Sequence, residues 1–179
     1  MNQAQVQAVL GFWFALGWND WWKQDPAFDA EVRDRFRALW EEQSEQVPEL
    51  FLGSADEALA AILLFDQFPR NMFRGHADQF ATDPLALAIA RGAIDRAYDD
   101  GMTPEQRGFL YMPFEHSEDL ADQRRSLLLF TALGSAEHLK YAKKHYAVIE
   151  QFGRFPHRNA MLGRKPTALE TAAGDVVPW

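Results

Sequence analysis

Apolar residues recur along this chain at the three- and four-residue spacing of amphipathic α-helices. One stripe at that spacing comprises Phe28, Val32, Phe36, Leu39 and Trp40. Residues 58–65 are apolar on every side, which predicts a central helix covered by its neighbours. The segment after Ser135 carries two apolar faces, so we expect its helix to lie between other elements.

Helix start signals accompany these segments. In Asp25-Pro26 and Asp83-Pro84, a carboxylate that can cap a helix precedes a proline, whose missing N–H is tolerated at the first helical position. Three further segments have the capping-box spacing, namely residues 54–57, 103–106 and 167–170. The Gly134-Ser135 pair predicts the end of one helix and the start of the next.

The whole pattern predicts an all-α fold of about eight helices, because no segment alternates with period two and β-branched residues. A chain of 179 residues suits one domain, and no linker or low-complexity tract interrupts it. We therefore expect a single helical domain over residues 1–179. The tail, residues 174–179, is either loose or docked on that domain.

The amino-acid composition excludes or disfavours several kinds of site and partner. The chain has no cysteine, which excludes disulfides, thiolate nucleophiles and cysteine-ligated zinc. Its net charge of −8 argues against binding to nucleic acid. The apolar run at residues 9–18 is shorter than the roughly 20 residues of a membrane span and lacks the flanks of a secretion signal. We expect a buried first helix, no membrane association and a cytoplasmic location.

Three stretches mix charged or amide side chains with aromatic residues and a proline: residues 66–75, 113–119 and 152–159. Solvated faces rarely need the aromatic residues, and plain cores rarely need so many polar groups. Each stretch also carries a signal for a helix end, and the ends of stacked helices gather on common rims. We expect side chains from all three stretches to share one network. It should include Asp66 or Arg70, then Glu115 or His116, and then Arg154, His157 or Arg158.

The same stretches resemble a family of uncharacterised, mostly bacterial proteins, the domain-of-unknown-function family 924. The resemblance rests on residues 9–13, 64–75, 109–118, 122–123, 152–159 and 162–164. It implies one helical domain of tetratricopeptide-like architecture, built from stacked antiparallel helix pairs. It implies no established reaction, ligand or catalytic residue.

The leading functional hypothesis is a pocket for a small anionic ligand or an acidic peptide segment, because guanidinium groups match carboxylates and phosphates. The expected lining residues are Arg70, Asn71, Arg74, His116, Arg154, His157, Arg158 and Asn159. The opposing interpretation is that Asp66, Glu118 and Asp122 neutralise the arginines, which makes the polar network purely structural.

An enzyme of hydrolase or lyase type is an alternative, with His116 or His157 as the base and Glu115 as a neighbouring carboxylate. Two structural interpretations of this stretch remain beside it. Either Ser117 caps the next helix, or one helix runs through and His116 lies in its apolar face. We expect no metal and no cofactor, since His138 and His145 lie ~10 Å apart along a helix.

A third hypothesis is a protein-interaction scaffold. Trp18, Trp21 and Trp22 stand in one connection, and exposed tryptophan is enriched in binding hot spots. Such residues also commonly close one end of a helical core. The sequence does not distinguish an enzyme from a binding protein, and it gives no oligomeric state.

Overall fold

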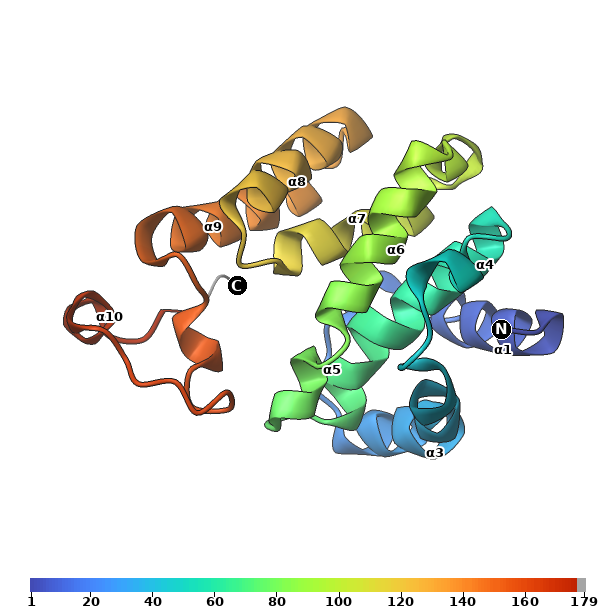
Figure 1. The fold of residues 1–179 in the computed structure, drawn as a ribbon, viewed down its shortest axis with the longest axis horizontal. Coiled ribbons are helices and arrows are strands. Elements are labelled where there is room, and N and C mark those ends of the chain that lie inside the picture. The colour runs from blue at the N-terminus through green and yellow to red at the C-terminus, as the bar shows by residue number, and fades with distance from the viewer. Residues whose placement is uncertain (177–179) are drawn as a thin grey trace. The chain divides into compact units, whose positions relative to one another are not determined.

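The computed structural model describes residues 1–176, and these contain helices and no strand, which confirms the all-α class (Figure 1). The α-helices are α1 (Gln3–Phe14), α2 (Trp18–Trp21), α3 (Pro26–Gln43), α4 (Ala55–Ile62), α5 (Phe68–Met72), α6 (Asp83–Asp95), α7 (Pro104–His116), α8 (Leu120–Leu133), α9 (Ala136–Phe152) and α10 (Ala168–Ala173). Shorter helical turns are η1 (Pro48–Phe51), η2 (Leu63–Gln67), η3 (Ala77–Phe80), η4 (Tyr98–Gly101) and η5 (Pro156–Arg158). Residues 177–179, the end of the predicted tail, lie outside the described residues.

The chain divides into two compact units, and the first ends at Leu110, inside α7. The single domain expected over residues 1–179 and the tetratricopeptide-like stacking both stay predictions. Within the second unit, α8 and α9 lie side by side as an antiparallel pair (Figure 1). The pair is joined by Gly134, which adopts a left-handed conformation that glycine tolerates, and by Ser135, which caps α9, as predicted.

The core of the first unit is built around α4, which packs against α1 and α6. Every residue from 58 to 65 is fully buried, so the predicted central helix is confirmed. Helix α3 packs on α5 and buries Val32 and Phe36 of the predicted stripe. The ring of Phe36 lies 4.6 Å from that of Phe68, centroid to centroid, at the centre of this contact.

Helix α4 continues into α5 through the π-helical turn η2. Pro69 has no N–H to donate to the carbonyl of Phe65, and the hydroxyl of Thr82 donates to that carbonyl instead, at 2.6 Å. The carbonyl of Asp66 receives a hydrogen bond from the side chain of Arg70. The carbonyls of Phe65 and Asp66 thus accept hydrogen bonds from side chains at this turn. Turns with π-helical hydrogen bonding are frequent at functional sites.

Most of the predicted helix starts are confirmed. Asp25 and Ser54 accept hydrogen bonds from the backbone N–H groups of Ala27 and Glu57. Asp83 differs, because it is the first residue of α6 and Thr82 occupies the cap position. The Asp83 carboxylate is engaged by Arg70 instead of the helix backbone, so its prediction as a cap is wrong.

The second unit has its own apolar cluster, in which Val148, Ile149 and Phe155 are buried. Phe152 and Val176 pack against this cluster. Position 176 of the predicted tail is therefore docked.

The buried position of Ile62 gives a direct test of this core. Ile62→Asp places a carboxylate at a site that is 0% exposed, and an unpaired buried charge costs several kcal/mol, comparable with a total stability of about 5–15 kcal/mol. We expect the variant to lose cooperative unfolding in circular dichroism melts. The matched control is Leu50→Asp, since Leu50 is 56% exposed and its variant should melt like the parent. A cooperative Ile62→Asp protein would show that the environment of α4 is misassigned.

Candidate functional site

The first of the three stretches forms an ion-pair network around Arg70. Its guanidinium donates to both carboxylate oxygens of Asp83, at 2.9 and 3.0 Å, and its Nη1 lies 3.5 Å from the carboxylate of Asp66. Asp66 is fully buried and also accepts a hydrogen bond from Gln67. Burial lowers the pKa of Arg70, but the two carboxylates outweigh it and raise that pKa above its usual range. The network therefore joins η2 and α5 to the start of α6.

A second network holds the next turn of the same stretch. Arg74 donates to both oxygens of the Asp29 carboxylate, at 2.6 and 2.9 Å, and the Asn71 amide donates to it at 2.8 Å. Burial alone would raise the pKa of Asp29, but the donors Arg74 and Asn71 hold that pKa below its usual range. Arg74 and Asn71 therefore fasten α5 to α3.

The second and third stretches meet within the second unit, at Glu118. Its carboxylate accepts hydrogen bonds from Arg164, at 2.6 and 3.0 Å, and from the backbone N–H of Phe155, at 2.8 Å. These donors keep the pKa of Glu118 below its usual range although burial acts to raise it. Arg164 also donates to the Phe155 carbonyl and to Asn159. This arginine fixes the turn at η5.

A fourth arginine, Arg154, is held by Glu170 through two hydrogen bonds of 2.6 and 2.7 Å. Glu170 also accepts from the backbone N–H of Thr167 and from the Asn159 amide. Hydrogen bonding from Arg154 is the largest cause that lowers the pKa of Glu170, to about 2. The predicted capping box at residues 167–170 is confirmed. Its glutamate, Glu170, also forms the ion pair with Arg154.

A histidine cluster lies in the same unit. His145 Nδ1 is 2.7 Å from the carboxylate of Glu115 and 3.0 Å from the Tyr141 carbonyl, and both Glu115 and His145 are buried. The ring of His116 lies 6.1 Å from that of His145, centroid to centroid. Because the Glu115 and Tyr141 oxygens beside His145 Nδ1 are both acceptors, this nitrogen carries a hydrogen in this arrangement.

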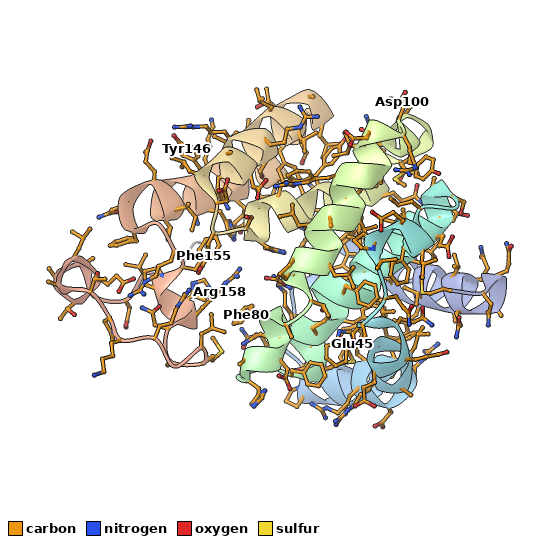
Figure 2. The ribbon with its side chains drawn as sticks, viewed as in Figure 1. Glu45, Phe80, Asp100, Tyr146, Phe155 and Arg158 are labelled. Atoms are coloured by element: carbon orange, nitrogen blue, oxygen red, sulfur yellow. The ribbon has the colours of Figure 1, made fainter. Side chains whose placement is uncertain are left out.

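Phe155 connects this cluster to the third stretch. Its ring centroid lies 5.6 Å from those of His145 and His157. The Arg158 guanidinium stacks over the same ring, with its central carbon 4.4 Å from the centroid (Figure 2). Arg158 Nη2 also donates to the His116 carbonyl at 3.0 Å. Two imidazoles and one guanidinium thus gather around a buried phenyl ring.

A hollow of about 580 Å³ opens beside η5. His157 and Asn159 line one side, and Glu170, Asp175 and Val176 are among the residues that line the other. Of the two carboxylates, that of Glu170 is matched by Arg154. The hollow gives a small molecule room next to the histidine cluster.

Ser117 does not cap the next helix, and one helix does not run through His116, so both structural interpretations of this stretch are wrong. Helix α7 ends at His116, and Asp119 caps α8 by accepting from Ala121 and Asp122 N–H groups. The Ser117 hydroxyl accepts from the Asp119 N–H and donates to the Asp122 carboxylate. Asp122, expected to partner the basic stretch, is thus engaged by Ser117.

Two of the three stretches therefore share a network, through Glu118 with Phe155 and through His116 with Arg158. That the first stretch joins them stays a prediction. Sequence reasoning missed His145, because it was assigned to an apolar face of its helix. Sequence reasoning also missed Asp29. Its position directly after Phe28, the first residue of the apolar stripe, could have indicated a partly buried carboxylate.

The three tryptophans Trp18, Trp21 and Trp22 differ in their surroundings. Trp18 and Trp22 are 41% and 46% exposed. Trp21 donates its indole N–H to the Trp13 carbonyl at 2.9 Å and packs against Phe109, which closes this end of the first core.

Residues 1–176 contain no group of three His, Asp or Glu side chains placed to hold a metal ion. Within the same residues, none of the helices combines the length and hydropathy needed to cross a membrane.

The lowered pKa of Glu170 predicts an acid-sensitive contribution to stability. The carboxyl has a pKa near 4.5 when unfolded and about 2 when folded, so its stabilisation is complete above pH 4.5 and is lost as pH falls toward 2. We expect the difference in unfolding free energy between parent and Glu170→Gln to be largest above pH 5 and to shrink by pH 2. Urea titrations at several pH values measure it.

The control for this measurement is Glu137→Gln, which removes an exposed pair with Lys140. Exposed pairs contribute little, so this variant should follow the parent at every pH. A difference for Glu170→Gln that does not change with pH would contradict the assigned pair.

The chain is similar to known bacterial proteins both in sequence and in structure. A family profile described as "Bacterial protein of unknown function (DUF924)" matches residues 9–173. A solved structure of a protein of unknown function from Agrobacterium tumefaciens is similar at 40% identity, over 95% of this chain and 96% of that one, with a TM-score of 0.89. None of the curated proteins matches the chain.

Proposed function

We propose, for a chain that belongs to the DUF924 family of bacterial proteins of unknown function, that it recognises a small anionic ligand or an acidic peptide segment. The site comprises Arg158, His116, His157 and Asn159, in the second unit. The proposed site keeps these four of the eight residues that the sequence predicted to line a pocket.

The observation that carries the proposal is the immobilised guanidinium of Arg158. Stacking on Phe155 and donation to the His116 carbonyl fix the plane of this group. A cation held in advance loses little conformational freedom when an anion arrives, which favours affinity. His157, which directly precedes Arg158 in the chain, lines the hollow beside η5 and provides a further donor for the same anion.

The remaining arginines of the expected pocket have structural roles in this proposal. Arg70, Arg74 and Arg154 each donate to a carboxylate through two hydrogen bonds. Paired donors of this kind match a ligand carboxylate or phosphate equally well. An external anion would therefore have to displace Asp83, Asp29 or Glu170.

Acid–base catalysis receives less support. The carboxylate–histidine pair in this unit is Glu115 with His145. It orients α9 against the end of α7, which is a structural role, and we prefer binding to hydrolase or lyase chemistry by His116 or His157.

Charge supports an anionic ligand for this part of the chain. Residues 111–179 contain nine basic and eight acidic residues, whereas residues 1–110 contain nine basic and eighteen acidic ones. The second unit is the part of this acidic protein in which an anion meets least repulsion.

Thermal-shift titration with sodium phosphate tests the proposal, against sodium chloride of equal ionic strength. Saturation at about 100 times Kd stabilises the folded state by ~2.7 kcal/mol, or about 5–10 °C in Tm for a chain of this size. Acetate and citrate are the carboxylate probes. We expect Arg158→Ala to abolish the shift, and Arg158→Lys to reduce it if the alanine variant fails to fold.

Two further variants separate the site from general effects of charge. Arg74→Ala removes a cation that is bound to Asp29 in the first unit, so it should lower Tm and keep the phosphate shift. Asp175→Asn removes a negative charge from the hollow and should enlarge the shift. Equal shifts in Arg158→Ala and the parent, or no anion-specific shift in the parent, would refute the proposal.

A further inference from the structure

Helix α1 has one buried face and one exposed face. Val6, Val9 and Trp13 are buried, whereas Ala8 and Gly11 are exposed. The first helix, which was expected to be buried, is thus buried along one face. The exposed face is unusual because residues 1–19 contain no Asp, Glu, Lys or Arg, although these residue types make up 25% of the chain. The cores of protein interfaces are depleted of charge in the same way.

A groove of about 510 Å³ runs between this face and α3. Its apolar lining consists of Ala8, Gly11, Phe12, Ala15, Leu16 and Phe28. The rings of Phe12 and Phe28 stack with centroids 5.7 Å apart. A Cβ atom added at Gly11 would lie more than 4 Å from the neighbouring atoms of the described chain, so glycine leaves room that a side chain would fill.

Two exposed aromatic side chains follow the groove-lining residues in the sequence. Leu16, in the lining, precedes Trp18 by two residues, and the Trp18 ring lies 5.6 Å from that of Trp22. Both indoles are partly exposed, and exposed tryptophan commonly dominates binding energy at interfaces. The small residues Ala8, Gly11 and Ala15 leave room for a helix laid in the groove.

The charge of the first unit specifies the helix. In the groove lining, Arg35 lies over the Phe12 ring at 4.4 Å and pairs with Glu31 at 3.1 Å, so these two charges cancel. Residues 1–110 as a whole carry twice as many acidic as basic residues, and Asp34 is exposed on α3. A second acidic unit would be repelled, whereas a helix with basic side chains beside its apolar stripe would be attracted.

We infer that the groove between α1 and α3 is a docking site for an amphipathic helix of a partner protein, one with Lys or Arg flanking its apolar face. This inference is independent of the anion site in the second unit. It assigns the interaction surface to Gly11 and the other residues that line the groove.

Fluorescence anisotropy with two labelled 18-residue peptides tests it on the full chain. Both peptides share one leucine and alanine face, which lysines flank in the first and glutamates in the second. We expect the lysine peptide to bind at least tenfold more tightly. Gly11→Arg should weaken its binding at least tenfold, because the side chain fills the groove and repels lysine. Gly11→Ala, which favours the helix and adds little bulk, should change Kd by less than about twofold.

Circular dichroism establishes that both Gly11 variants fold. Equal binding of the lysine peptide to parent and Gly11→Arg would overturn the inference, as would no binding to the parent. A dimer of the parent, detected by light scattering and dissociated by Gly11→Arg, would show that a second copy occupies the groove instead. The phosphate shift should be unchanged in Gly11→Arg, so the two proposals succeed or fail separately.

Discussion

Carboxylates removed from water must meet positive charge or N–H donors, and this constraint determines much of the structure within each unit. An unmatched buried carboxylate would cost several kcal/mol, a large part of the stability of a folded chain. Asp29 and Asp66 satisfy the constraint with Arg74 and Arg70 in the first unit. Glu118 satisfies it with Arg164 in the second. Each match joins elements that apolar packing alone would leave free to slide.

The proline in the first stretch shows how one backbone defect organises its surroundings. Pro69 withholds a donor from Phe65, and Thr82, thirteen residues later, supplies it. Thr82 also accepts a hydrogen bond from the Trp40 indole at 3.1 Å. One hydroxyl therefore connects α3, η2 and the start of α6. The Asp83 carboxylate next to it is left to hold Arg70.

Local features were predictable from the sequence, because periodicity and caps depend on residues within one or two turns. The burial of residues 58–65 and the caps at Asp25 and Ser135 are of this kind. Pairing across the chain was not predictable in the same way. Glu118 and Arg164 are 46 residues apart, and no spacing rule relates them. His145 shares its helix face with apolar residues, so its buried partner Glu115 was hidden in the pattern.

The contacts of α10 have a consequence for proteolysis. This short helix follows a connection without regular α-helix at residues 160–167, and Glu170 binds Arg154 and Asn159 on the other side of it. A protease that cuts the connection would leave the helix fastened through those side chains. The nicked chain would remain associated in native conditions. Because the pKa of Glu170 is about 2 while it binds Arg154, the fragment would stay attached in mild acid and would be released as pH falls toward 2.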